Sequence, residues 1–458
     1  MIAIFARSRW TRPAAVVAVV ALVVGYGFVF AREPQRSDWY CCFVRAALRM
    51  EQGQRIHIVD KSPYAYPPLM AMLTIPLAQF PAGVGIVAWY GVSLATLALA
   101  AWYAWRLIGG PTHERLAGRW AAVAALAILC SMRFIIGPLQ TRQFDTVIAA
   151  LLMAGCWRLA RGHQPSGGLL LGLATAMKCT PLLLVPYLAW RRWYVAAALV
   201  ALTAVAANLL PEFCYPQQSG GWYLADWKRH FLDVSHRVPP GTWFSGLAQN
   251  QSLAGTFQRL FRYGLPLSTS AITGGEFPID SIPLLRGCVY GASALLLAMT
   301  LYFGRRGRRG FDFRSSEDND AGVAMRHFAA EVSAVFALML LVSPMTSRAH
   351  YLILILPSLL ICRAAIIDSD RFFRWLLPVL LVCGPLVTKG LIGKTLGDLA
   401  LAWSLPTCYA LACLAGMWRL MARGGAARRA PVAEFVRIPQ ALGKIHPALA
   451  TFTTACRE

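Results

Sequence analysis

Residues 166–190, SGGLLLGLATAMKCTPLLLVPYLAW, decide the fold of this chain. Lys178 divides them into two uncharged halves of twelve residues each. Twelve helical residues rise about 18 Å, which is shorter than the roughly 30 Å hydrocarbon core of a bilayer. Thr180-Pro181 favours a helix break directly after the lysine. The pattern predicts a broken or re-entrant helical pair with a cation at membrane depth. Such a cation is tolerated where it lines a protein cavity.

The rest of the chain has the composition of a polytopic membrane protein. Hydrophobic residues make up 57% of the sequence and charged residues only 14%, whereas a soluble domain carries about a quarter charged residues. The net charge of +23 comes from basic residues that separate apolar runs. This pattern indicates loops that set the membrane topology, with membrane lipid as a partner and no nucleic acid.

Hydropathy predicts an all-α chain with about ten full spans, while the broken pair returns to the side from which it enters. Both termini then lie on the inner side, where most of the basic residues fall, as the positive-inside rule requires. We expect one membrane domain over residues 1–421, with long outer loops at 32–83 and 212–285, an inner linker at 305–330 and a basic tail at 422–458. The expected spans are residues 13–31, 84–105, 119–138, 142–158, 193–211, 286–304, 331–347, 350–366, 373–391 and 399–418.

Several ionisable residues fall near the outer ends of these spans. Besides Lys178 they are Arg133, Asp145 and His350 with Arg348. Ionisable side chains at membrane depth usually face a functional interior. Their shared position predicts one polar cavity that opens outward.

Asp38 begins a short helix in the first outer loop. At 3.6 residues per turn, Arg45 and Arg49 share its face, and we expect this helix to lie at the membrane surface. An aspartate at this position is also a common helix N-cap, so a structural role and a catalytic role are both open.

Three weaker signals lie in the two outer loops. Tyr64 and Tyr66 precede Pro67-Pro68 and are expected at the level of the lipid headgroups. Asn250-Gln251-Ser252 matches a glycosylation acceptor, a motif that is frequent by chance. A disulfide from Cys214 to Cys41 or Cys42 is a minor alternative to free thiols.

Taken together and in order, five stretches resemble the C-superfamily membrane glycosyltransferases, specifically glycosyltransferase family 87. They are Asp38 with its helix and Gly53; Tyr64 to Pro68 with Pro76-Leu77; Gln143-Phe144-Asp145; Gly168 to Leu173 with Lys178 to Leu182; and Asn250 to Leu253 with Ser343-Pro344 and His350. The chain departs from the family pattern at Arg142 and Asp145, at Ile56-His57 and at Ala349.

The resemblance implies a GT-C-like fold in the plasma membrane and a transfer reaction at its outer face. A hexose, mannose first, would pass with inversion from a polyprenyl-phosphate donor to a hydroxyl of a glycan or glycolipid, and no metal or other cofactor is expected. A transporter or flippase of a lipid-linked sugar is the alternative, because broken helices with ionisable residues are also transporter features.

The family's catalytic carboxylate corresponds to Asp38, which would take the proton of the attacking hydroxyl. Fixed cations would stabilise the leaving phosphate. We expect Lys178, His350, Arg348 and Arg45 to supply them, and Tyr64, Tyr66, Gln143, Asp145, Asn250 and Gln251 to bind substrate. Asp145 is also a rival base or a purely structural partner of a nearby cation.

Overall fold

The computed structural model describes residues 21, 24–32, 35, 37–58, 64–111, 118–233, 238–242, 247–264, 281–305 and 318–424. Within these ranges the chain forms helices and no strand, which confirms the all-α prediction. Most of the first expected span, and the expected tail from residue 425 on, lie outside the described residues.

Seven of the described helical segments are long and apolar enough to cross a membrane. The expected number of ten is therefore not confirmed, because α7 (Asp145–Ala160) and α17 (Arg371–Cys383) are shorter. The seven segments are α5 (Ala82–Leu107), α6 (Arg119–Thr141), α10 (Tyr194–Cys214), α14 (Ile282–Gly304), α15 (Asp318–Val342), η8 with α16 (Arg348–Leu354 and Ile355–Ile366) and α19 (Leu405–Gly424).

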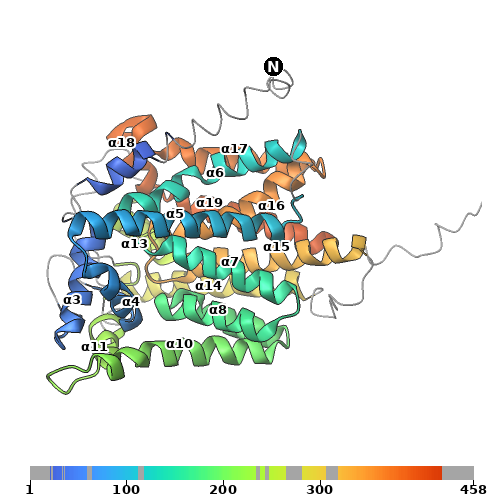
Figure 1. Cartoon of the computed structure of the whole chain (residues 1–458). Helices are drawn as coiled ribbons and strands as arrows, with labels where there is room; N and C mark the ends of the chain where they lie inside the picture. Colours follow the sequence, from blue (N-terminus) through green and yellow to red (C-terminus); the bar gives the residue numbers. More distant parts are fainter. Residues whose placement is uncertain are drawn as a thin grey trace, which may run out of the picture.

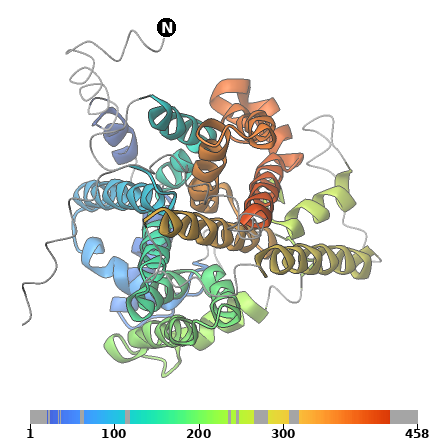
Figure 2. The ribbon, with the colours of Figure 1, turned by 90° about the vertical axis from the view of Figure 1, so that its right-hand side faces the viewer.

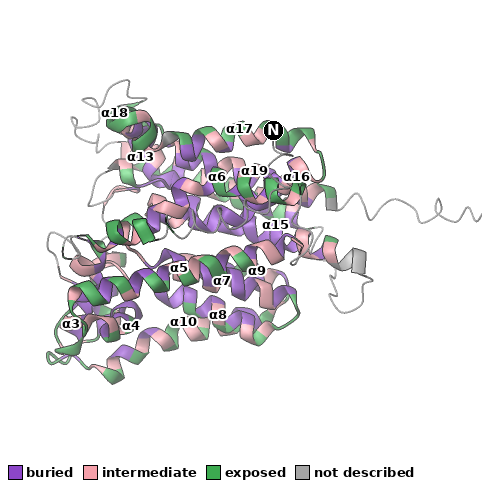
Figure 3. Cartoon of the chain, turned by 45° about the horizontal axis from the view of Figure 1, so that its top comes forward, coloured by how far each residue is buried: buried purple, intermediate pink, exposed green. Residues whose placement is uncertain are grey.

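Helix α15 is the centre of the bundle. It contacts α5, α7, α16 and α19, and 83% of its most apolar stretch is buried, so other helices surround it (Figure 1). Helices α7, α8 (Gln164–Met177) and α10 form one group, while α6, α16, α17 and α19 form another (Figure 2). Exposed residues lie mainly on the outer helices, including α10 (Figure 3), where Leu202 and Val205 are suited to face lipid.

The described parts of the expected outer loops gather at one end of the bundle, which we call the loop end (Figure 1). Their helices are α3 (Arg45–Glu51), α4 (Pro68–Ala78), α11 (Tyr223–Trp227) and α13 (Leu253–Tyr263). Helix α3 packs on α4 and buries Ala46, Ala47 and Met50, and its expected position at the membrane surface stays a prediction. The loop end is therefore a packed layer of short helices.

The expected inner linker at 305–330 is wrong in its second half. Helix α15 already begins at Asp318, and its residues Phe328, Ala329 and Ala330 are buried. Charged residues in this segment predict a solvated loop, but the helix begins among them. Directly after the segment, Glu331 pairs with residues from another helix. Its carboxylate lies 3.2 Å from Arg191 Nη1 and accepts a hydrogen bond of 2.9 Å from the Tyr187 hydroxyl.

The expected span at 373–391 is also wrong. Helix α17 stops at Cys383, and η9 (Pro385–Val387) and α18 (Lys389–Ala402) follow, so that α19 begins only at Leu405. A side-chain carbon at Gly384 would lie 2.5 Å from the carbonyl oxygen of Cys130, and Pro385 has no backbone N–H to continue the helix. Helix α18 therefore adds to the loop end (Figure 1).

Candidate active site

The predicted break at Lys178 is confirmed. Helix α8 ends at Met177, Lys178 has an extended backbone (φ −156°, ψ 119°), and the chain continues through η3 (Thr180–Leu183) into α9 (Leu184–Trp190). Lys178 Nζ donates a hydrogen bond of 2.8 Å to Asp145 Oδ1 at the start of α7. The exposed fraction is only 13% for the Lys178 side chain and 6% for the Asp145 side chain. The break thus presents a buried ion pair.

Asn208 on α10 holds this break in place. Its Nδ2 donates to the carbonyl oxygens of Ala176 and Ala204, each at 3.0 Å, and its Oδ1 accepts from the backbone N–H of Leu69 at 3.2 Å. One side chain therefore joins α8, α10 and α4, and its contact with α8 is at Ala176, two residues before Lys178. Our sequence analysis missed this residue, although a lone asparagine in a long apolar span is a usable signal.

Asp38 lies at the loop end and faces the start of α7. Its Oδ2 accepts a hydrogen bond of 3.0 Å from Gln143 Nε2. The side chain makes no capping hydrogen bond to the following helix, which excludes the N-cap interpretation. Asp38 is exposed to solvent, yet the surrounding protein desolvates it and raises the pKa of its carboxyl group, against the opposing effects of Gln143 and the Arg142 charge.

The helical register predicted for this segment is wrong. Residues Trp39–Val44 form a π-helix, η2, before α3 begins at Arg45. A π-turn contains one residue more than an α-turn, so the alignment of Asp38 with Arg45 and Arg49 at 3.6 residues per turn does not hold. The donor-binding role of Arg45 stays a prediction.

Aromatic rings fasten η2 to the turn between α6 and α7. Trp39 stacks on Trp89 with ring centroids 4.5 Å apart, and Phe144 packs against both rings. Trp89 Nε1 donates to the carbonyl oxygen of Arg142 at 3.1 Å. Arg142 has a left-handed backbone with φ of 55°, which makes the turn tight. This turn brings Asp38 and Gln143 together.

Tyr66 lies near both carboxylates, Asp38 and Asp145. Its ring is near enough to Asp38 and Asp145 to interact with their charges, and Lys178 Nζ lies 5.9 Å from its centroid. His57 Nε2 is 3.0 Å from the Tyr66 carbonyl oxygen and supports this loop. Within the described part of the chain, the Tyr66 hydroxyl has no hydrogen-bond partner, so it is available to a substrate.

Tyr64 has a different environment from its neighbour. It is only 5% exposed, and its hydroxyl donates to the Pro67 carbonyl oxygen at 3.0 Å. The protein itself therefore covers the ring of Tyr64, and its expected position at the level of the lipid headgroups stays a prediction. Its role in substrate binding stays a prediction.

His350 and Arg348 do not share one environment. His350 Nδ1 accepts from the backbone N–H of Ser347 at 3.2 Å, and the ring interacts electrostatically with Lys178 and Asp145. Arg348 instead interacts with Arg133. The single polar cavity predicted from sequence is thus divided into two groups of charged residues.

Asn250 and Gln251 fasten the second outer loop to the bundle. Asn250 is fully buried, and its Nδ2 donates to the carbonyl oxygens of Gly241 at 2.9 Å and Pro344 at 2.8 Å. Gln251 Nε2 donates to Leu401 at 2.9 Å. Asn250 is therefore inaccessible as a glycosylation acceptor in this fold. The proposed contacts of both residues with substrate stay predictions.

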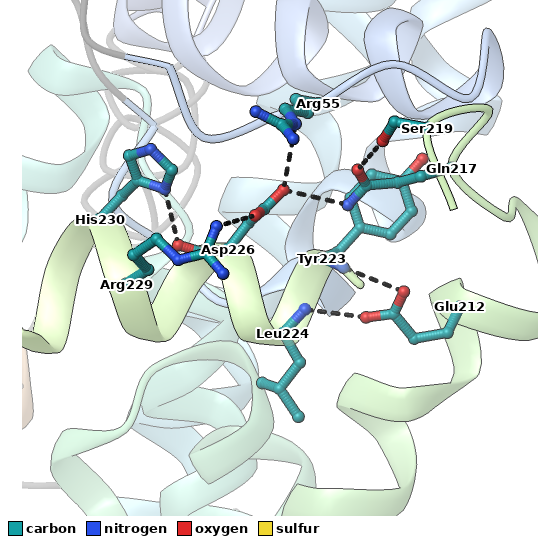
Figure 4. Close-up of polar contacts among 9 residues, drawn as sticks. All are labelled: Arg55, Glu212, Gln217, Ser219, Tyr223, Leu224, Asp226, Arg229 and His230. Carbon is teal, nitrogen blue, oxygen red and sulfur yellow. Dashed lines mark hydrogen bonds and ion pairs between the residues drawn. The ribbon is translucent and has the colours of Figure 1, made fainter. Parts of the chain in front are cut away.

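The remaining polar contacts of this loop position α11 (Figure 4). Asp226 accepts from Gln217 Nε2 at 3.2 Å and lies 3.9 Å from Arg55 Nε. The next residue, Trp227, donates through Nε1 to the Ala65 carbonyl oxygen at 3.1 Å, beside Tyr66. The second loop thus supports the site from outside. The three cysteines considered for a disulfide, Cys41, Cys42 and Cys214, form none within the part of the chain that the structure describes.

Comparison with known proteins agrees with this architecture. The model of glycosyltransferase family 87 matches residues 64–344. A polyprenol-phosphate-mannose-dependent alpha-(1-2)-phosphatidylinositol pentamannoside mannosyltransferase of Mycobacterium tuberculosis (strain CDC 1551 / Oshkosh) is 32% identical over 152 residues, or 32% of this chain and 34% of the relative.

A second relative matches over a longer stretch. The polyprenol-phosphate-mannose-dependent alpha-(1-2)-phosphatidylinositol mannoside mannosyltransferase of Mycolicibacterium smegmatis (strain ATCC 700084 / mc(2)155) is 28% identical over 322 residues, or 68% of this chain and 64% of the relative. The chain therefore spans less than two thirds of the length of either relative.

Proposed function

Since the chain belongs to glycosyltransferase family 87, we propose that it transfers mannose from polyprenyl-phosphate mannose to a hydroxyl group of a lipid-linked glycan. One observation carries this proposal. The Asp38 carboxylate, held by Gln143, lies beside the loop of Tyr66, which in turn lies over the buried pair of Lys178 and Asp145. The relatives that act on phosphatidylinositol mannosides support the class of donor and of acceptor.

Asp38 serves as the general base. The acceptor oxygen attacks the anomeric carbon, the bond from that carbon to the phosphate oxygen breaks, and the proton of the acceptor hydroxyl passes to the Asp38 carboxylate. A raised pKa suits this task, because a more basic carboxylate takes a proton more readily from a weak nucleophile. The transition state resembles an oxocarbenium ion.

Lys178 and His350 hold the phosphate of the donor. Asp145 occupies one of the three N–H donors of the Lys178 ammonium group, so two donors remain for phosphate oxygens. His350 uses Nδ1 as an acceptor, which leaves Nε2–H as a donor. Two fixed donors in a poorly hydrated site stabilise the charge that develops on the leaving group. Asp145 is then the structural partner of Lys178, and Asp38 is the base.

We assign the loop end to the outer face of the plasma membrane, and both chain termini to the cytoplasmic side. The basic residues near the opposite end support this orientation under the positive-inside rule. A polyprenyl chain then reaches the site laterally from the membrane. A transporter or flippase is not favoured, because the proposed catalytic groups gather at one end of the bundle, whereas transporters bind near the midplane.

Substitution of Asp38 tests the proposal. Asp38→Asn should abolish mannose transfer in vesicles supplied with polyprenyl-phosphate mannose and a phosphatidylinositol mannoside, since the amide cannot accept the proton. Asp233→Asn is the matched control, because Asp233 lies at the loop end and, among the described residues, its carboxylate pairs with the exposed side chain of Lys228. Full activity of Asp38→Asn would exclude Asp38 as the base, and no transfer by the unmodified protein would contradict the proposed function.

A further inference from the structure

Two arginines outside the candidate active site lie close together. Arg133, Gly137 and Gln140 occupy one face of α6, and this face packs against η8. A side-chain carbon at Gly137 would lie 3.6 Å from the Cα atom of Ala349. Arg348 is the first residue of η8, and its guanidinium is near enough to that of Arg133 for mutual repulsion.

This arginine pair carries positive charge without a matching carboxylate. Arg133 is 8% exposed, and its Nη1 donates to the neutral Oε1 of Gln140 at 3.3 Å. The half-buried side chain of Arg348 makes no hydrogen bond or ion pair with any residue that the structure describes. The one acid that acts on Arg348, Asp398, is already paired with Lys389. A buried cation such as Arg133 normally has an anionic partner, because desolvation costs several kcal/mol. We therefore expect a ligand to supply the anion.

The arginine pair is separate from the donor site. Arg348 and His350 are two residues apart on a 3₁₀-helix with three residues per turn, so they point to different sides of η8. Lys178, on the His350 side, is already neutralised by Asp145 at 2.8 Å. The arginine side of η8 therefore has the stronger uncompensated positive field.

We propose that Arg133 and Arg348 bind the phosphodiester group of the lipid-linked glycan acceptor. The inference rests on the proposed function and specifies its acceptor as an anionic glycophospholipid. Guanidinium groups bind phosphate oxygens in bidentate geometry. In such an acceptor, sugar rings separate the phosphodiester from the reacting hydroxyl, which matches a site on the far side of η8.

Binding to the purified full chain in detergent tests this inference without turnover. The probes are dioctanoyl phosphatidylinositol, dioctanoylglycerol and a short-chain polyprenyl phosphate. Arg348→Gln and Arg133→Gln should each weaken phosphatidylinositol binding by about tenfold, as expected for the loss of one charged hydrogen-bond pair. Both variants should change the binding of the other two probes by less than about twofold. Arg286→Gln, an exposed arginine at the start of α14, should leave all three unchanged.

Thermal unfolding of the ligand-free variants separates a binding role from a structural one. Removing one of two repelling cations should leave the melting temperature unchanged or raise it. If a glutamine variant fails to fold, Arg348→Lys keeps the charge and should retain part of the phosphatidylinositol affinity.

Equal losses for phosphatidylinositol and polyprenyl phosphate would overturn the inference, because they would assign the pair to the donor. So would an unmodified protein that does not prefer phosphatidylinositol over dioctanoylglycerol. Neither result would contradict the proposed function. That function would be contradicted if the unmodified protein transferred no mannose.

Discussion

At the scale of single residues, the surroundings of Asp38 suit a proton acceptor. Gln143 donates to its carboxylate at 3.0 Å, and desolvation by the surrounding protein raises the pKa of the carboxyl group above its ordinary value of 3.8. Gln143 belongs to the turn between α6 and α7, which the stacked rings of Trp39 and Trp89 and the ring of Phe144 hold against η2. The amide thus orients the carboxylate while desolvation makes it more basic.

This environment predicts the pH dependence of the reaction. The base must be ionised, so kcat/KM should fall as the pH drops through the raised pKa of Asp38, at a higher pH than for an ordinary aspartate. A pH–rate profile of kcat/KM with polyprenyl-phosphate mannose measures this fall, which is the acidic limb of the profile. Gln143→Leu removes a contact that stabilises the ionised form and should move the limb to still higher pH. A limb at or below pH 3.8 would contradict the prediction.

His57 predicts a pH dependence of stability. Burial lowers its pKa from 6.5 to about 4, and the ring is 2% exposed. In the unfolded chain the His57 imidazole is protonated below pH 6.5, whereas in the folded chain it is protonated only below about pH 4. The free energy of unfolding should therefore fall by roughly 3 kcal/mol between these values and then level off. Denaturant titrations in detergent measure it.

The control for this prediction is His57→Phe. The free energy of unfolding of this variant should not show the fall between pH 6.5 and about pH 4 that His57 causes. The ring would still pack near Tyr64, which lies 5.4 Å from the imidazole. An unchanged slope between pH 6.5 and pH 4 in the variant would show that other groups cause the effect.

At the scale of elements, the break between α8 and η3 depends on two kinds of information. Pro181 and the short apolar halves predict that a break occurs beside Lys178. Asn208 decides where the two ends go, because it binds backbone groups of α8, α10 and α4. Proline acts within a few residues of its own position, whereas Asn208 acts across distant segments.

Asn208→Ala should lower stability by about 1–3 kcal/mol, since it leaves buried backbone groups without partners. It should also raise the KM for the donor, because Lys178 follows Ala176 by two residues. Thermal unfolding and donor titration measure the two effects. Thr96→Ala is the control, since its hydroxyl binds only carbonyl groups of its own helix. Equal effects of both substitutions would exclude a special role for Asn208.

At the scale of the whole molecule, Glu331 joins three helices that are far apart in the sequence. Its carboxylate is 3.2 Å from Arg191 Nη1 and 3.1 Å from His327 Nδ1, and it accepts from the Tyr187 hydroxyl. His327 Nε2 in turn lies 3.3 Å from the Met421 carbonyl oxygen. This buried network connects α9, α15 and α19.

Glu331→Gln should destabilise the protein by about 3–5 kcal/mol, because the buried Arg191 would lose this carboxylate. Asp368→Asn is the matched control. Its partner Arg363 is 3.0 Å away, but the Asp368 side chain is 41% exposed, so the loss should stay below about 1 kcal/mol. Thermal unfolding of both variants compares them. Similar small losses would indicate that Glu331 does not hold the bundle together.

The sequence by itself determined the all-α membrane class, the break at Lys178 and the resemblance to glycosyltransferase family 87. Hydropathy, proline and short motifs act locally, so they can be recognised along one chain. The same local reasoning failed for α17 and for the first half of α15, where partners from other helices decide whether a segment can continue.

Only the tertiary structure decided how the charged residues combine. It paired Lys178 with Asp145, placed Gln143 on Asp38, and separated Arg348 from His350. The physical reason is that a buried charge is stable only with partners, and those partners come from segments that are far apart in sequence. Which ion pairs form is therefore a property of helix packing.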